Sequence, residues 1–156
     1  MSEQKELYSL LIPLRQERLL VPRMCVAEVI AFAEPERTEQ APDWLLGTID
    51  WNGRRIPVVS FDAPGEEPVV PRKAARRRIV VFHALTRQLK VAFYGVLTQG
   101  FPQLVRINPD VVSADADSEL PANQPVLCRV RMIHEFPLIP DVERLESMLA
   151  ELANAA

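Results

Sequence analysis

An Asn-Gly dipeptide between two apolar runs is the feature that most constrains the fold of this chain. Residues 46–61 read LGTIDWNGRRIPVVSF, with Asn52 and Gly53 at the centre. This dipeptide is the strongest short-range signal of a β-hairpin, because a type I′ turn needs positive φ at both central residues. The turn fixes which residues lie opposite one another: Trp51 and Arg54, Asp50 and Arg55, Ile49 and Ile56, Thr48 and Pro57. One face of the hairpin should therefore carry a cross-strand Asp50–Arg55 pair.

Prolines argue against long helices in the rest of the chain. There are 14 prolines and 5 glycines among the 156 residues, and a proline inside a helix removes a hydrogen bond and clashes with the preceding turn. Short apolar runs lie between these prolines. They predict two strands in 7–21 around a polar turn, and further strands at 46–61, 78–84, 89–96, 103–107, 126–132 and 136–139. This pattern is typical of an all-β fold built from small barrels.

Two segments have helical spacing instead. After Pro22, the apolar residues Val26, Val29 and Ile30 fit one or two helical turns. Near the C-terminus, Asp141 has the side-chain type of an N-cap. Behind it, apolar residues recur at intervals of three and four: Val142, Leu145, Leu149 and Leu152. We predict an amphipathic C-terminal helix whose apolar stripe packs on the strands and is not an interface.

The charge of the chain argues against general nucleic-acid binding. The net charge is −3 and the pI is about 5.5, whereas such binding needs a basic surface that releases counterions. The basic run 72–78, RKAARRR, has no interleaved aromatic residues for base stacking. We interpret it as a solvated loop between barrels, one that could face an acidic partner. The acidic stretch 110–119 is likewise interpreted as a solvated loop.

Metal-binding and catalytic patterns are missing from the sequence. Cys25 and Cys128 lie far apart, and His83 and His134 have no cysteine or carboxylate at ligand spacing. The common nucleotide-binding and hydrolase motifs do not occur. We therefore expect no metal, no cofactor and no catalytic residues, with the cysteines as small apolar side chains in a reducing compartment. The first 20 residues lack an apolar signal-peptide core, so we expect a cytoplasmic protein.

Four motifs, in order, resemble the CheW-like family of chemotaxis coupling proteins. The family's Gly-x-x-Asn-Leu-Arg-Gly-x-x-x-Pro-Val hairpin is matched here by Gly47, Asp50, Trp51, Asn52, Gly53, Pro57 and Val58. Upstream, VAEVI (26–30) resembles the family's Val-x-Glu-Ile and aligns Glu28 with its acid. Downstream, YGVLTQGF (94–101) is similar to a Gly-Leu-Val-Val-Asp-x-Val strand, and LIPDVERL (138–145) fits the closing strand and final helix. The resemblance spans residues 6–150.

Two motif positions depart from the family. Its hairpin arginine falls on Asn52, so the Glu–Arg pair implied for Glu28 is missing in its usual form. Either Arg54 or Arg55 could take that role from a different angle. The family's aspartate in the second barrel falls on Gln99. We interpret the chain as a divergent member, similar to the ChpC accessory protein of type IV pilus chemosensory systems, which act in twitching motility.

The resemblance implies an all-β fold of two intertwined, SH3-like, five-stranded barrels with a C-terminal helix. One CheW-like domain would span residues 1–156. Its first barrel would cover about 6–62 together with C-terminal elements, and its second barrel about 76–136. The Pro- and charge-rich stretch 62–77 is the best internal boundary in the sequence.

The resemblance also implies a non-catalytic adaptor at the receptor arrays of the inner membrane. It would join the regulatory domain of a CheA-like histidine kinase to the tip of a methyl-accepting chemotaxis receptor, without entering the membrane. The expected kinase-contact residues are Glu28, Ile30, Asp50, Trp51, Arg54 and Arg55. The expected receptor-contact residues, in a groove between the barrels, are Val96, Leu97 and Phe101.

Within the hairpin we interpret Trp51 as a binding anchor and not as a core residue. It adjoins the turn and faces Arg54, a residue type that is almost never fully buried, and Trp and Arg are enriched at interface hot spots. Two other functions stay open at this stage. One is an OB-like barrel that binds single-stranded nucleic acid, and the other is an enzyme with an unfamiliar active site.

Overall fold

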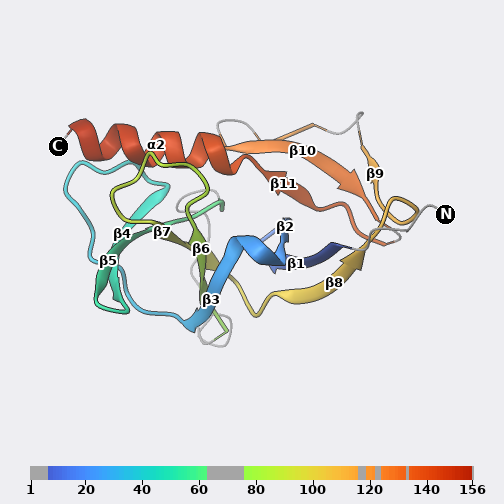
Figure 1. The fold of residues 1–156 in the computed structure, drawn as a ribbon, viewed down its shortest axis with the longest axis horizontal. Coiled ribbons are helices and arrows are strands. Elements are labelled where there is room, and N and C mark those ends of the chain that lie inside the picture. The colour runs from blue at the N-terminus through green and yellow to red at the C-terminus, as the bar shows by residue number, and fades with distance from the viewer. Residues whose placement is uncertain (1–6, 63–75, 116–118, 122–123, 133, 156) are drawn as a thin grey trace.

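The structure is a computed structural model that describes residues 7–62, 76–115, 119–121, 124–132 and 134–155. Its strands and helices follow one another as Figure 1 shows. In chain order they are β1 (Leu7–Pro13), β2 (Arg18–Pro22), the 3₁₀ turn η1 (Arg23–Cys25), β3 (Val26–Ala31), β4 (Leu45–Trp51), β5 (Arg54–Val59), β6 (Arg78–His83), β7 (Phe93–Thr98), β8 (Gln103–Ile107), β9 (Ser113–Ala114), β10 (Val126–Arg131), β11 (Leu138–Pro140) and the helix α2 (Val142–Ala155). The predicted all-β fold with one C-terminal helix is confirmed.

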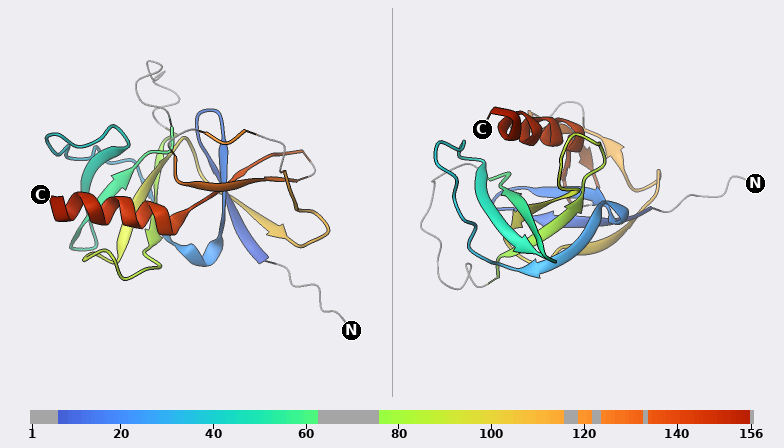
Figure 2. Two further views of the ribbon diagram at one scale, coloured as in Figure 1. Left: turned by 90° about the horizontal axis from the view of Figure 1, so that it is seen from above. Right: turned by 60° about the vertical axis from the view of Figure 1, so that its left-hand side comes forward.

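The described strands form two sheets. One has six strands in the order β8-β1-β2-β11-β10-β9, and the other has five in the order β3-β6-β7-β5-β4. Figure 2 shows the two curved sheets at opposite ends of the molecule, with α2 lying along the five-stranded one. The expected barrel ranges of about 6–62 and about 76–136 cut across these sheets, because β3 pairs with β6 and β5 pairs with β7. Chain order did not reveal this exchange, since sheet membership depends on long-range pairing.

The Asn-Gly hairpin has the predicted geometry. Asn52 and Gly53 have φ of 47° and 72°, as a type I′ turn requires. All four predicted cross-strand pairs of β4 and β5 are present, including Trp51 opposite Arg54. The register of this hairpin could be derived from sequence because a two-residue turn leaves the strands one pairing.

The segment 26–30 is a strand, so the predicted helical turns there are wrong. In this part of the chain only the three residues of η1 are helical. Val26–Ala31 pairs antiparallel with β6 from Phe82 to Arg78. A bulge interrupts this pairing between Val26 and Glu28. Valine and isoleucine favour strands, and the ladder partner that decides between helix and strand lies about 50 residues away in the sequence.

The largest core cluster lies between the two sheets and under α2. The six-stranded sheet contributes Ile12, Leu19, Val21 and Leu138, and the five-stranded sheet contributes Val59, Val80, Phe82, Tyr94 and Val96. From α2, Leu145 and Leu149 are 2% and 5% exposed. Burial of such side chains contributes about 1.5–3 kcal/mol each. The apolar stripe of the helix is therefore packing, as predicted.

Two polar contacts fix α2 in place. The backbone N–H of Arg144 donates to the Asp141 carboxylate at 3.1 Å, which makes Asp141 the N-cap. Further along, Glu146 is fully buried. Its carboxylate accepts hydrogen bonds from the backbone N–H groups of Leu85 and Thr86 and from the Thr86 hydroxyl, at 3.0, 2.8 and 2.7 Å. The buried acid thus ties the helix to the β6–β7 connection.

We expect Glu146→Gln to lower the free energy of unfolding by about 2 kcal/mol. A glutamine has one acceptor oxygen for these three donors, and its NH₂ group would face backbone N–H groups. Urea denaturation measures the change. The matched control is Glu151→Gln, an exposed position of the same helix, which should stay within about 0.5 kcal/mol of the wild type. Equal midpoints for both variants would contradict this role of Glu146.

Candidate partner-binding site

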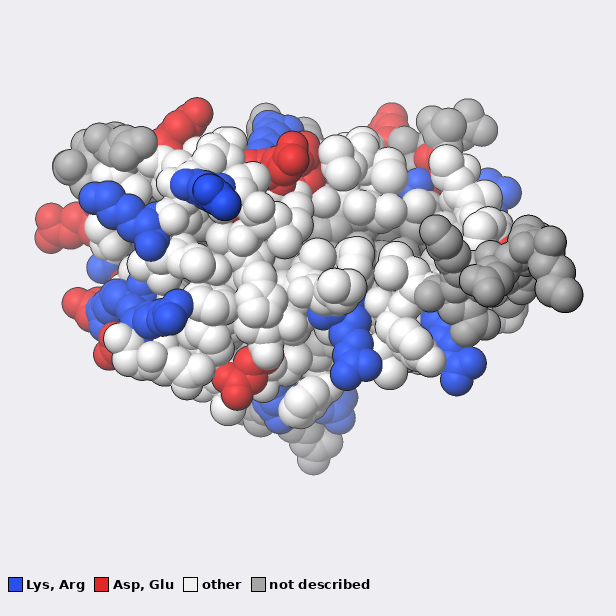
Figure 3. Space-filling view, viewed as in Figure 1, with Lys and Arg blue, Asp and Glu red and all other residues white. Residues whose placement is uncertain are grey.

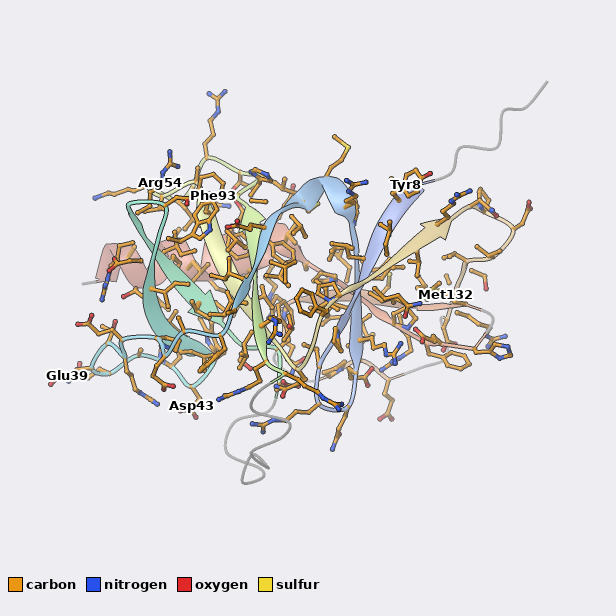
Figure 4. All side chains as sticks on the ribbon, turned by 90° about the horizontal axis from the view of Figure 1, so that it is seen from below. Tyr8, Glu39, Asp43, Arg54, Phe93 and Met132 are labelled. Atoms are coloured by element: carbon orange, nitrogen blue, oxygen red, sulfur yellow. The ribbon has the colours of Figure 1, made fainter. Side chains whose placement is uncertain are left out.

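Four side chains converge at the hairpin end of the five-stranded sheet. The Trp51 indole N–H donates to the Glu28 carboxylate at 2.6 Å. The rings of Trp51 and Phe93 lie 4.8 Å apart at an angle of 59°, and the Arg54 guanidinium lies 5.0 Å from the centre of the Phe93 ring. Figure 4 shows Arg54 and Phe93 next to each other at the hairpin tip. We call Glu28, Trp51, Arg54 and Phe93 the hairpin-end cluster.

The cluster brings together side chains from opposite edges of the five-stranded sheet. Glu28 lies on β3 and Trp51 on β4, and these are the two outer strands of the five-stranded sheet. Phe93 begins β7, near the middle of the sheet. The indole–carboxylate bond therefore links one edge of the sheet to the other. An arrangement of this kind holds the side chains in fixed relative positions before any partner binds.

Trp51 is both a packing residue and a surface residue. It is half-buried and packs against the small core cluster that contains Ile49 and Ile56. The interpretation of Trp51 as an anchor outside the core is therefore too strict, because one part of the indole covers this cluster while the rest stays accessible. Ile30 is also half-buried against the same cluster.

The two arginines of the hairpin have different surroundings. Arg55 donates to the carboxylates of Asp50, at 3.2 Å, and Glu36. These hydrogen bonds raise the pKa of Arg55, with that to Asp50 the larger cause. Arg55 and Asp50 thus lie on the face opposite Trp51 and are paired with each other. Among the described residues, neither arginine pairs with Glu28. The Trp51 indole donates to the Glu28 carboxylate instead.

The expected receptor contacts do not form one surface. Val96 is completely buried and Leu97 is 7% exposed, so both belong to the interior of the five-stranded sheet and not to a groove. Val96 and Leu97 are therefore wrong as direct contact residues, because β7 is a central strand with β5 and β6 on either side. Phe101 is 66% exposed, and the Arg78 guanidinium lies 4.5 Å from the centre of its ring.

Several surface residues were missed in the sequence. Phe93 was read only as part of an apolar run, and its place beside Trp51 depends on the strand order. Met24 is 85% exposed, and Leu104, in the predicted strand 103–107, is 52% exposed. Contiguous exposed apolar patches mark interaction sites, whereas single exposed apolar side chains are normal. The sequence signal for exposure of Met24 was its place just after Pro22, between the predicted strands of 7–21 and the apolar residues from Val26 onward.

A polar hollow lies in the six-stranded sheet, away from the hairpin-end cluster. It has a volume of about 400 Å³ and is lined by residues 16–18, Arg129 and residues 134–137. Arg129 donates twice to the Glu17 carboxylate, at 2.7 and 3.0 Å, and Arg18 pairs with Glu135. The hydrogen bonds that Arg129 donates to Glu17 raise the pKa of Arg129. These paired charges hold the β1–β2 turn against β10. We therefore interpret the charged residues of this hollow as stabilising the fold and not as a binding site.

Neither metal binding nor a membrane span is indicated in the part of the chain that the structure describes. No group of three or more His, Cys, Asp or Glu side chains there could hold a metal ion. No described helix is long and apolar enough to cross a membrane. The two cysteines are free and half-buried, and burial raises the pKa of the Cys25 thiol. Residues 72–75 of the basic run lie outside the described residues.

Comparisons with known proteins agree with this architecture. The family model described as CheW-like domain matches residues 9–148. Among solved structures, the chain is similar to the scaffolding protein TtCheW from Thermoanaerobacter tengcongensis, with a TM-score of 0.70 and 15% sequence identity. That similarity covers 87% of this chain and 89% of the other, and it shows the shared fold of two SH3-like barrels. None of the curated proteins compared with the chain matches it.

We expect Trp51→Phe to lower the free energy of unfolding by about 1 kcal/mol. The phenyl ring keeps the contact with Phe93 but has no N–H group to donate to Glu28. Chemical denaturation of Trp51→Phe, Glu28→Ala and the double variant measures the bond directly. The two losses should be clearly non-additive, as for residues in contact. Strictly additive losses would show that the indole–carboxylate bond adds no stability.

Proposed function

The chain belongs to the CheW-like family, and from this we propose that it is a non-catalytic adaptor that couples a chemoreceptor to a chemotaxis-type histidine kinase. The observation that carries the proposal is the hairpin-end cluster. It places a half-buried indole, a phenyl ring and a guanidinium together on the motif by which the chain resembles the family. Trp and Arg dominate the energetics of protein interfaces. A pre-positioned cluster also loses little side-chain entropy when it docks.

The kinase-binding surface is centred on Trp51, Arg54 and Phe93, and the partner is the regulatory domain of a CheA-like kinase. Ile30 supports this surface from β3, where it packs on the same core cluster as Trp51. Glu28 contributes by holding the indole. Asp50 and Arg55 stand on the other face of the hairpin, paired with each other, and form the margin of the surface.

The receptor-binding surface lies on exposed apolar side chains near the junction of the two sheets. Met24 belongs to η1, which connects β2 of one sheet to β3 of the other. Leu104 and Phe101 lie on and just before β8. Figure 3 shows a broad uncharged area across the middle of one face of the molecule. Such a surface suits the apolar face of a helix at the receptor tip.

The pathway we propose is a type IV pilus chemosensory system, with the protein at cytoplasmic receptor arrays. The basis is the divergence of the chain from the family motif: Asn52 occupies the position of the hairpin arginine and Gln99 that of the aspartate. The Gln99 side-chain amide donates to the Asp62 carboxylate at 3.1 Å, a hydrogen bond for which an ionised aspartate has no donor. A pilus or histidine kinase gene beside the coding sequence would support this choice, whereas a flagellar gene cluster there would contradict it.

Adaptor function is tested with three components. A receptor signalling-domain fragment, immobilised on beads, should retain the kinase of the same organism only when this protein is added. Retention of the kinase without the protein, or no retention with it, would contradict the adaptor role.

We expect Trp51→Ala to weaken binding to the kinase regulatory domain about 30-fold, or about 2 kcal/mol. Titration calorimetry at a temperature where the variant stays folded measures the affinity. Because Trp51 also covers core residues, its truncation should cost up to about 2 kcal/mol of stability, less than for a fully buried aromatic.

The matched control is Phe136→Ala. Phe136 is 50% exposed and lies in the β10–β11 connection of the other sheet. Its truncation removes a similar aromatic area and should leave kinase affinity unchanged. Equal losses for the two variants would show that binding does not depend on the hairpin end.

A further inference from the structure

Building on the proposed function, we propose that Arg54 binds a carboxylate of the kinase regulatory domain, next to an apolar group that covers Trp51 and Phe93. The hairpin-end cluster then selects its partner by chemistry: an acidic side chain beside an apolar one. Arg54 would be the residue that determines specificity, and the aromatic rings would supply most of the contact area.

The first observation is that Arg54 has no carboxylate partner among the described residues. Its neighbour Arg55 pairs with both Asp50 and Glu36. Arg54 is exposed, and in the described part of the chain no carboxylate lies within 4 Å of its guanidinium. Glu28, the acid of the cluster, accepts the hydrogen bond of the Trp51 indole. Within the described residues, the two adjacent arginines therefore differ: Arg55 has acidic partners and Arg54 has none.

The second observation is the position of Arg54 over an aromatic ring. Its guanidinium lies 5.0 Å from the centre of the Phe93 ring, and attraction to the ring electrons involves no acceptor oxygen. The five N–H donors of a guanidinium lie in its plane and form a fixed fork. The geometry of this fork matches the two oxygens of a carboxylate, which a partner could present beside the ring.

Docking of a partner would also desolvate Arg54. A partner that covers the exposed parts of Trp51 and Phe93 also removes water from Arg54, which lies against the Phe93 ring. An arginine buried at an interface without a charged partner would carry a large desolvation penalty. A carboxylate from the partner removes this penalty and forms charge-assisted hydrogen bonds. The surface thus favours acidic partners and rejects neutral or basic ones.

The surrounding charges act in the same direction. Figure 3 shows Lys and Arg side chains over the β4–β5 hairpin and the β6–β7 connection. That connection contains Arg87 and Lys90, which are exposed. Acidic side chains lie at the same end, where Asp50 and Glu36 pair with Arg55 and Glu28 accepts the Trp51 N–H. The basic side chains there raise the association rate of an acidic partner at low salt.

The experiment compares Arg54→Met with Arg131→Met in binding to the kinase regulatory domains of the same organism. Methionine retains much of the length of the side chain and removes its charge. Arg131 is a matched control, since its guanidinium lies 6.0 Å from the centre of an exposed aromatic ring, that of Phe136, in the other sheet. We expect Arg54→Met to weaken binding about 10-fold or more and to reduce its dependence on salt between about 50 and 300 mM. Arg131→Met should bind like the wild type, and Arg54→Lys should recover part of the affinity.

The acid on the partner is located by single Asp→Asn and Glu→Gln variants of the kinase domain. One of them should lose as much affinity as Arg54→Met and cause no further loss in combination with it. The inference is overturned if Arg54→Met binds with wild-type affinity and salt dependence, or if every acid variant adds its full loss to that of Arg54→Met. If the wild-type protein binds none of these kinase domains, the proposed function fails, and the inference that rests on it fails too.

Discussion

Neither sheet of this protein can bury its apolar face alone, and the rest of the structure depends on that constraint. The main core cluster takes Ile12 and Leu19 from the six-stranded sheet, Val80 and Val96 from the five-stranded sheet, and further side chains from α2. The chain crosses between the sheets at η1 and again between β7 and β8. Packing of one sheet against the other therefore contributes stability to both, and unfolding of either would expose the shared core.

This shared core leaves the far end of the five-stranded sheet available for binding. The sheet has its own small cluster around Ile56 and Ile79, and Trp51 and Phe93 cover that cluster from the hairpin side. The indole is thus held by packing below, by the Phe93 ring beside it, and by Glu28 across the sheet edge. Rigid aromatic residues on a strand framework suit a scaffold, which must bind partners without chemistry of its own.

The missing family arginine is explained by the same contacts. In the family pattern an arginine would pair with the acid at Glu28, whereas here the Trp51 indole donates to that carboxylate. The acid therefore keeps a donor although Asn52 stands at the arginine position. Asn52 instead takes the positive φ that the tight turn needs. Arg54 lies over the Phe93 ring and has no carboxylate partner among the described residues.

The sequence by itself determined the local features of this protein. The Asn52–Gly53 turn set the hairpin register, because a type I′ turn permits one pairing, and the spacing of Leu145 and Leu149 behind Asp141 set the helix and its buried stripe. Tertiary structure decided what depends on distant partners. It made 26–31 a strand by placing it beside β6, and it buried Val96 by placing β7 between β5 and β6. It also brought Phe93 to Trp51 across about 40 residues of sequence, since pairing between remote strands is encoded in no short stretch of sequence.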